Sequence, residues 1–221
     1  MPDAGTDPLG LEALGVLLAA LGLSSVSGLR AYFPLLAVAV GSHVSDGSGH
    51  HLITLSKPFQ ALGTPWFVAL LILLVLGEFT VDKLPVIDHI SDLIHTVVRP
   101  LSGAIIMAGV SNPLSEKNVW AAAAVGAVLS LTVHAAKAAT RPVVTATTGG
   151  LGNPVVSFVE DGLTVVIGVL AILAPIVAFV LLLLAAFAIG WLVYKGVRKL
   201  RAKRQPPVAG GGSWSLPGGT V

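Results

Sequence analysis

Long stretches of almost uninterrupted apolar residues, separated by short polar segments, run along most of the chain. An α-helix needs about 20 apolar residues to cross the ~30 Å hydrocarbon core of a bilayer, and somewhat fewer where the bilayer thins. By that measure the candidate spans are residues 9–28, 31–42, 64–83, 100–111, 119–141, 154–173 and 175–194. The pattern predicts an all-α integral membrane protein. Because the second and fourth segments are short, the bundle is expected to have six or seven transmembrane helices.

Polar segments at both ends divide the chain into four parts. Residues 1–8 form an N-terminal tail that lacks the cationic region of a secretory signal, so the first apolar run is kept as a membrane segment. Residues 9–194 form a single transmembrane domain. Residues 195–204 form a basic flank, and the Pro-, Gly- and Ser-rich residues 205–221 predict a disordered tail. A proline in the LAPIVA segment predicts a tight hairpin between the last two spans.

Composition and charge support this class of protein. With 54% hydrophobic and 11% charged residues, the chain does not have the balance of a soluble domain. Cytoplasmic ends of spans collect Lys and Arg, so the basic flank predicts a cytoplasmic C-terminus, and by alternation residues 84–99 and 142–153 lie on the same side. We expect this flank to be solvated and not to bind nucleic acid. The chain has no cysteine, which excludes disulfides and thiolate chemistry.

A weak internal repeat relates residues 64–111 to residues 119–173. The aligned pairs are Trp66 with Trp120, Lys83 with Lys137, and Pro100 with Pro154. Each unit predicts an inward span, a cation near its cytoplasmic end, a connector and an outward span that begins at a proline. Repeats are common in transporter folds, in which the site lies where the repeats meet. Few other positions match, so a chance alignment stays open.

The Gly-rich stretch RPVVTATTGGLGNPVVSFVED, residues 141–161, connects the spans of the second unit. It has neither the P-loop nor the dinucleotide-binding spacing, which excludes a soluble nucleotide site. Pro142 is expected to end the incoming helix at Arg141, with Asn153 as the N-cap of the next helix. The N–H groups of that helix start, with the hydroxyl of Thr148, predict an anion-binding site. A short cytoplasmic turn with ordinary caps is the alternative.

Ionisable residues inside the predicted spans carry the candidate chemistry. Each costs about 2.5–3.5 kcal/mol to insert, so such residues mark a function or a neutralising pair. We expect them to converge in the cytoplasmic half of the membrane. The candidates for substrate binding are Lys83, Arg99, Lys137, Arg141, Thr148 and Asn153, and those for proton relay are Glu78, Asp82, His134, Glu160 and Asp161. Because acids and bases nearly balance, a structural polar core that neutralises itself is the alternative.

Three further polar features have both a functional and an ordinary interpretation. A helical stripe of Asp88, Asp92, His95 and Arg99 faces either the site or water, as in an interfacial amphipathic helix. Arg30, in SSVSGLRAYFP, either lines the same site at a helix break or lies in a cytoplasmic turn. The adjacent His50 and His51, near Asp46, lack further ligands, so a solvated loop is favoured over a metal site.

Three segments resemble one family of bacterial multi-pass membrane proteins, described as domain of unknown function 4126. They are SGLRAYFPLL, EFTVDKLPVIDHISDLIHTVVRPLSGA and HAAKAATRPVVTATTGGLGNPVVSFVED, which occur in the same order and with the same flanking spans. The resemblance covers roughly residues 9 to 195. It implies an all-helical domain in the bacterial inner membrane, and it brings no activity or catalytic residue.

The function predicted from these features is transport of a small solute or ion, with the lipid bilayer as partner. The cations would hold an anionic group while a carboxylate or histidine carries a coupling proton. One alternative is a membrane enzyme acting on a lipid headgroup, with His95 or His134 as base and Asp92 or Asp161 orienting it, although its usual motifs are missing. Another is a structural or assembly protein with no site. We expect no cofactor, no metal and no nucleic acid, and a homo-oligomer stays open.

Overall fold

A computed structural model describes residues 10–45, 49, 51–81, 88–110 and 112–204. Within those residues the chain is helical apart from its connecting segments and two isolated β-bridges, Ser45 with His51 and Leu55 with Val110. The elements are α1 (Leu11–Val26), α2 (Tyr32–Gly41), the 3-10 helix η1 (Lys57–Gly63), α3 (Pro65–Val81), α4 (Asp88–Gly109), α5 (Pro113–Lys117), α6 (Val119–Thr148), α7 (Asn153–Leu173) and α8 (Pro175–Arg204). The predicted all-α class is confirmed.

The apolar helices differ in length. In the described part of the chain, α6, α7 and Pro175–Arg198 of α8 are each long and apolar enough to cross a bilayer. The pair η1 and α3 is a fourth candidate span if its 64° bend is accepted. Shorter apolar helices are α1, α2 and Ile94–Gly109 of α4. Three or four full-length candidate spans, with shorter apolar helices beside them, indicate a membrane location.

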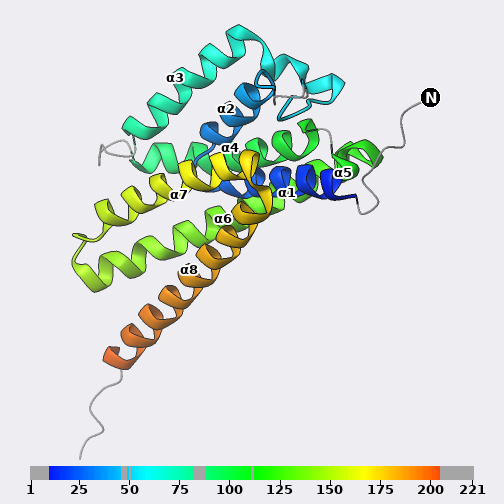
Figure 1. Cartoon of the computed structure of the whole chain (residues 1–221). Helices are drawn as coiled ribbons and strands as arrows, with labels where there is room; N and C mark the ends of the chain where they lie inside the picture. The colour runs from blue at the N-terminus through cyan, green and yellow to red at the C-terminus, as the bar shows by residue number, and fades with distance from the viewer. Residues whose placement is uncertain (1–9, 46–48, 50, 82–87, 111, 205–221) are drawn as a thin grey trace, which may run out of the picture.

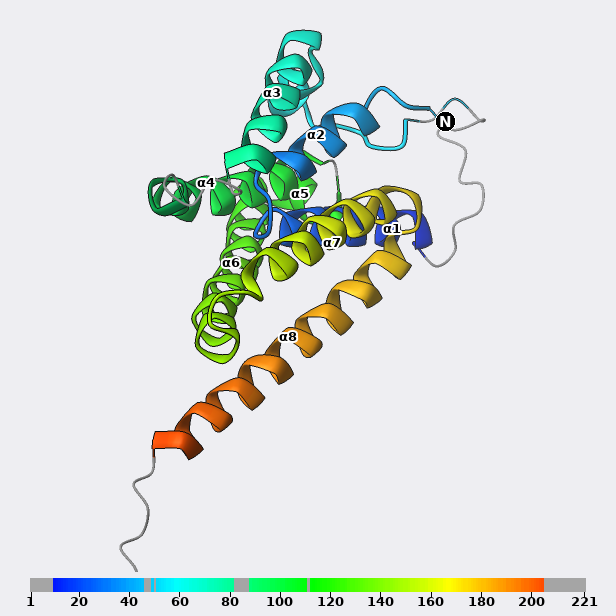
Figure 2. The ribbon, with the colours of Figure 1, turned by 90° about the vertical axis from the view of Figure 1, so that its left-hand side faces the viewer.

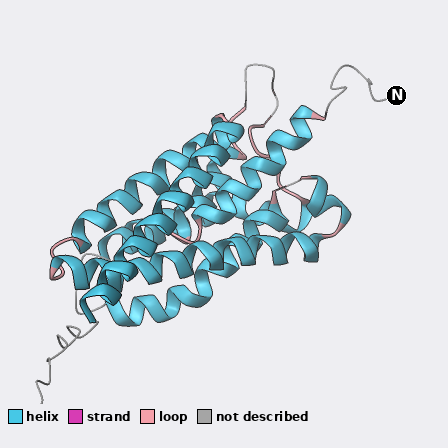
Figure 3. Cartoon of the chain, turned by 90° about the horizontal axis from the view of Figure 1, so that it is seen from below, coloured by secondary structure: helices cyan, strands magenta, loops and turns pink. Residues whose placement is uncertain are grey.

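The helices form a bundle (Figures 1 and 2), and within it α4 packs closely against α6. Seen from below, they run side by side, and connecting segments gather mainly at the two ends (Figure 3). At the α4–α6 crossing, a Cβ on Gly103 would lie 2.5 Å from the carbonyl oxygen of Gly126, and one on Gly126 would lie 2.6 Å from the Cβ of Met107. Small residues allow this close approach, which is typical of helix packing in membranes.

We expect Gly126→Ala to lower the free energy of unfolding by about 1–3 kcal/mol, because the added methyl group overpacks this crossing. Gly190→Ala in α8 is the matched control, since a Cβ there would meet nothing within 4 Å. The control should be neutral or slightly stabilising, because alanine favours a helix over glycine by up to about 1 kcal/mol. Chemical unfolding in detergent micelles measures both. Equal effects of the two substitutions would contradict the close crossing.

Two predicted helix boundaries at prolines are wrong. Residues 100–111 do not begin a helix, because α4 is continuous and Pro100 lies inside it. Likewise α6 does not end at Arg141 but continues through Pro142 to Thr148. A proline removes one helical hydrogen bond and bends a helix, and neighbouring helices in a membrane protein can compensate for that loss.

Helix α6 ends at the glycines that follow Thr148, and not at Pro142. The C-cap Gly149 has φ 63° and Gly150 has φ 91°, the left-handed conformation with which helices commonly end. The glycines of this stretch therefore make the reversal between α6 and α7. The hairpin predicted between the last two spans lies where expected, since α7 ends at Leu173 and α8 begins at Pro175. Residues 1–8 and 205–221 lie outside the described residues.

Candidate functional site

The break between α1 and α2 places Arg30 inside the protein. Residues 27–31 are all buried, and Arg30 is only 1% exposed. Its Nε donates to Oδ1 of Asp161 at 2.9 Å, and its Nη2 donates to the same oxygen. Its Nη1 donates to the carbonyl oxygen of Glu78 at 3.1 Å, and the guanidinium lies 4.8 Å from the ring centroid of Phe79. One side chain therefore ties the α1–α2 turn to both α3 and α7.

Glu78, near the end of α3, binds the start of α2. Its carboxylate accepts hydrogen bonds from the backbone N–H groups of Ala31 at 2.8 Å and Tyr32 at 3.1 Å. These are among the N–H groups that a helix leaves unsatisfied at its first turn, where the helix dipole also favours a negative charge. Nδ1 of His95 lies 3.8 Å from Oε1 of Glu78, and the His95 ring makes an edge contact with Tyr32.

Lys137 of α6 and Glu160 of α7 form a buried ion pair. Nζ of Lys137 lies 3.0 Å from Oε2 of Glu160, and it also donates to the carbonyl oxygen of Leu29 at 3.3 Å. The two side chains are only 2% and 9% exposed. This pair therefore joins α6, α7 and the turn between α1 and α2.

Arg99 of α4 reaches α6 through its side chain and its backbone. Its Nη1 lies 2.7 Å from Nδ1 of His134, and its carbonyl oxygen accepts a hydrogen bond from the hydroxyl of Ser130 at 2.7 Å. Ser27 in the α1–α2 turn lies 2.9 Å from that same hydroxyl. Arg99, Ser130 and Ser27 are almost fully buried. Buried polar groups thus link α4, α6 and the turn.

Together these side chains make one set, which we call the polar cluster: Arg30, Glu78, His95, Arg99, His134, Lys137, Glu160 and Asp161. They come from the α1–α2 turn, α3, α4, α6 and α7, whose arrangement is shown in Figure 1. At 1.5 Å per residue, Asp161 lies about 18 Å from the end of α7 at Leu173, and Lys137 lies about 17 Å from the end of α6 at Thr148. These members of the cluster therefore lie well inside α7 and α6, away from the helix ends.

The predicted anion site at the α6–α7 turn has a different arrangement. Asn153 is the first residue of α7, and the N-cap position is held by Gly152 without a side-chain cap. The Asn153 amide donates to the hydroxyl of Thr145 at 2.9 Å, and the hydroxyl of Thr148 accepts from the N–H of Gly152 at 3.0 Å. These groups bond across their own turn, about a helix turn or more beyond the polar cluster. Arg141 is half-buried there.

Sequence comparison places this architecture in one family. The family model described as "Domain of unknown function (DUF4126)" matches residues 17–195. The chain belongs to this family. No curated protein and no solved structure matches the chain. The region matched to DUF4126 begins inside α1 and ends in α8, so it contains every residue of the polar cluster.

For this DUF4126 chain, the structure brings together six of the predicted site residues: Glu78, Arg99, His134, Lys137, Glu160 and Asp161. Two of these predicted site residues, Lys137 and Glu160, are in direct contact, with Nζ 3.0 Å from Oε2. The predicted site residues Asp82 and Lys83 lie outside the described residues. The same holds for the side chains of Asp88 and Asp92 in the polar stripe.

Other members of the site were not among the predicted site residues. The sequence is compatible with Arg30 either in the site or in a cytoplasmic turn, and it predicts no role for Ser27, Ser130 or Thr164. All three hydroxyl residues are buried, and the hydroxyl of Thr164 donates to the carbonyl oxygen of Glu160 at 2.8 Å. The available signal was a cluster of serines inside an apolar stretch, since hydroxyl groups can satisfy backbone oxygens where helices approach closely.

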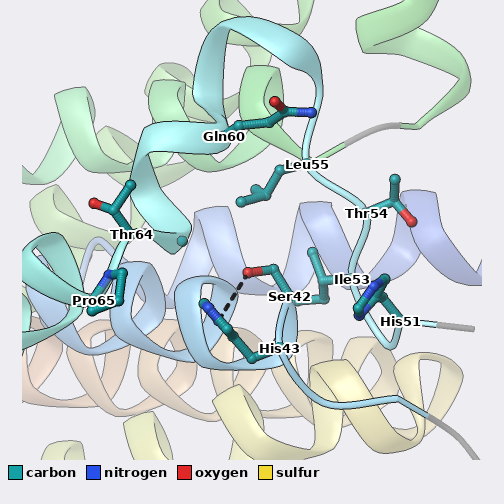
Figure 4. Close-up of a pocket in the computed structure, with 10 residues that line it drawn as sticks. Ser42, His43, His51, Ile53, Thr54, Leu55, Gln60, Thr64 and Pro65 are labelled. Carbon is teal, nitrogen blue, oxygen red and sulfur yellow. Dashed lines mark hydrogen bonds between the residues drawn. The ribbon is translucent and has the colours of Figure 1, made fainter.

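A separate open pocket of about 450 Å³ lies at the far end of α2 (Figure 4). Polar side chains of Ser42, His43, His51, Gln60 and Thr64 contribute to its lining. Because α2 has 10 residues, this pocket is separated from the polar cluster by about 15 Å along the helix. Among the described residues, no group of three or more His, Asp and Glu side chains has a geometry that could hold a metal ion. Asp46 and His50 lie outside those residues.

Proposed function

We propose that this protein moves a small solute or ion across the bacterial inner membrane through the polar cluster. The observation that supports it is the convergence of buried acids and bases from α3, α4, α6 and α7 on the break between α1 and α2. In the proposal this site lies within the cytoplasmic half of the membrane. Ionisable groups at that depth are costly and are typical of ion and substrate pathways. Broken helices at membrane depth commonly line such sites, because their backbone groups are then available to a ligand or to the protein itself.

The proposed membrane domain comprises residues 9–194 and contains the apolar helices α1, α2, α3, α4, α6, α7 and α8, for which apolar length alone predicts six or seven transmembrane helices. Exposed tryptophans support this placement: Trp66 and Trp120 stand at the starts of α3 and α6, as expected at one membrane interface. Trp191 lies under the ammonium of Lys195 at 3.8 Å, as expected at the other. The basic residues 195–204 would then be cytoplasmic, continuous with α8, and followed by the tail.

The proposed roles follow the charges. Arg99 and Lys137, with Lys83, would hold an anionic group, and Glu78, His134, Glu160 or Asp161, with Asp82, would carry a coupling proton. Arg141, Thr148 and Asn153 would contact the solute at the cytoplasmic turn between α6 and α7. The two units of the proposed repeat, residues 64–111 and 119–173, would contribute α3 with α4 and α6 with α7 to opposite sides of the cluster.

A structural role is the second candidate function, and the pairing of charges favours it. Glu160 contacts Lys137, Asp161 contacts Arg30, and Glu78 caps α2. A polar core of this kind can hold helices together without binding a solute. The lipid-headgroup enzyme receives less support, because the structure pairs Asp161 with Arg30 and His134 with Arg99, where that hypothesis pairs a histidine with an aspartate.

Ion flux separates the two functions. Purified protein in liposomes loaded with a pH-sensitive dye would be given gradients of chloride, phosphate or acetate under an imposed membrane potential. If the cluster is a transport site, we expect anion-dependent proton movement that falls at least tenfold in Glu160→Gln. Lys117→Gln, a change at an exposed cation on α5, is the matched control and should leave the flux unchanged.

The double variant Lys137→Gln/Glu160→Gln covers the case in which a single change unfolds the protein. It removes both charges together, so no buried charge is left without its partner. A double variant that is folded and inactive supports transport through this pair. Flux that persists in the folded double variant would assign the pair a structural role, and wild-type protein without anion-dependent proton movement would contradict the proposal.

A further inference from the structure

Both outer ends of the α1–α2 pair lie at one end of the bundle. A Cβ on Gly15, in the first turns of α1, would lie 3.8 Å from the ring of Pro175, which begins α8. A Cβ on Gly41, the last residue of α2, would lie 3.5 Å from a methyl group of Ile172 at the end of α7. The start of α1 and the end of α2 are therefore both beside the turn between α7 and α8.

The turn between the two helices lies deep inside the bundle. A Cβ on Gly28 would lie 2.8 Å from the Cβ of Val133, in the middle of α6. Arg30 binds Asp161, which is about 18 Å from the end of α7 by helical rise. Asp161 is thus about half-way along a hydrocarbon core ~30 Å thick if α7 ends at its surface, and the long Arg30 side chain reaches that level from the turn. With only 16 and 10 residues, α1 and α2 are also too short to reach the far side from the α7–α8 turn.

The protein satisfies the polar groups of this turn, as an irregular backbone at membrane depth requires. The carbonyl oxygen of Leu29 accepts from Lys137, and the N–H groups of Ala31 and Tyr32 donate to Glu78. Gly28 allows the turn to pack directly against the backbone of α6. A turn emerging at a membrane surface would need none of these long-range partners, because water would hydrate it.

We propose that α1 and α2 form a re-entrant hairpin, which enters the membrane and leaves it by the same face. The remaining helices α3, α4, α6, α7 and α8 then cross the membrane, so that the full crossings are fewer than the six or seven expected from apolar length alone. The start of α1, the end of α2 and the start of α3 then lie on the face opposite to the end of α8. On that face the hairpin covers the polar cluster, and the pocket in Figure 4 lies at its base. This proposal does not depend on transport.

Cysteine labelling tests the side on which α1 begins, since the chain has no cysteine of its own. Single variants Leu11→Cys, Lys57→Cys and Arg198→Cys, all at exposed positions, would be treated with a membrane-impermeant maleimide in spheroplasts and again after permeabilisation. We expect Leu11→Cys to react like Lys57→Cys and opposite to Arg198→Cys. Reaction of Leu11→Cys with the same sidedness as Arg198→Cys would overturn the hairpin.

Disulfide cross-linking tests how deep α1 reaches, which labelling alone does not show. A Cβ on Gly22 would lie 3.4 Å from the Cβ of Ala171, close to the ~3.5–4.5 Å that a disulfide spans. We expect Gly22→Cys/Ala171→Cys to cross-link on mild oxidation, whereas Gly22→Cys/Thr164→Cys, about 10 Å deeper on α7, does not. If α1 instead ran straight across the membrane from the face of the α7–α8 turn, helical rise would place residue 22 about 16 Å from its start. Residue 22 would then be level with Thr164 and not with Ala171.

Folding is checked for each cysteine variant by gel filtration in detergent before oxidation. Gly15→Cys/Pro175→Cys gives a second pair at the outer end, at a Cβ-to-ring distance of 3.8 Å, and it adds no group to the buried turn. Cross-linking of either outer pair in folded protein, with at least fivefold less in the deeper pair, supports the hairpin. Folded variants in which only the deeper pair cross-links would overturn it.

Discussion

Replacing Lys137 with methionine is expected to lower the free energy of unfolding by about 3–5 kcal/mol, because it leaves the carboxylate of Glu160 buried without its cation. Both side chains are at least nine-tenths buried, and their charged atoms are 3.0 Å apart. Methionine keeps an unbranched apolar stem of similar length, so that the change reports mainly the lost charge. Chemical unfolding in mixed micelles, followed by tryptophan fluorescence, measures the difference.

Two further variants show whether the loss comes from the pair. Adding Glu160→Gln to Lys137→Met removes the uncompensated charge, so the double variant should be clearly more stable than Lys137→Met alone. Lys117→Met, at an exposed position on α5, should change stability by less than about 0.5 kcal/mol. If Lys137→Met were no more harmful than Lys117→Met, the buried ion pair would be contradicted.

The same variants bear on function as well as on stability. If the polar cluster is only structural, neutralising both partners should restore the stability, because the stability then depends only on the balance of charge. A transport site predicts that stability returns while flux stays low, because the double variant lacks the groups that bind and release an ion. Measuring unfolding and flux on one set of variants therefore separates the two candidate functions.

The helical bundle could be predicted from local pattern because an apolar run long enough to span a membrane has few other stable forms. In lipid a backbone must satisfy its own hydrogen bonds, which restricts long apolar segments to helices. Local pattern also predicts that the ionisable residues inside the spans converge, because each is costly in lipid unless it has a partner or a function. Helical rise converts sequence separation into depth without any knowledge of tertiary contacts.

Helix boundaries at Pro100 and Pro142 could not be predicted in this way. The sequence contains the proline but not the neighbouring helices that stabilise the chain on both sides of it, and inside a packed bundle the helix continues. The helix end at Gly149 was predictable in principle, because glycine adopts a left-handed conformation at little cost. In the Gly-rich stretch, the glycine therefore predicts the end of the helix better than the proline does.

The place of Arg30 was beyond local pattern for a different reason. A cation between two short apolar segments is compatible with a surface turn and with a buried one. Its burial depends on Glu78 and Asp161, which lie 48 and 131 residues away in the sequence. The guanidinium can be buried only because these groups converge on it, since burying an isolated charge is strongly unfavourable.

Replacing Arg30 with methionine is accordingly expected to lower the free energy of unfolding by about 3–5 kcal/mol, because the carboxylate of Asp161 and the carbonyl oxygen of Glu78 lose their donor together. Arg30→Lys should lose less stability, because lysine keeps the positive charge. It should still lose some, because lysine cannot reproduce the three hydrogen bonds that Nε, Nη1 and Nη2 donate. Chemical unfolding in mixed micelles measures both variants.

The matched control is Arg198→Met, at an exposed position near the end of α8, which should change stability by less than about 0.5 kcal/mol. A double variant Arg30→Met/Asp161→Asn should recover part of the loss, but the carbonyl oxygen of Glu78 would still lack its donor, so recovery stays incomplete. Full recovery would mean that Arg30 acts only as a counter-ion to Asp161. Incomplete recovery is the result expected of a residue that also ties the α1–α2 turn to α3.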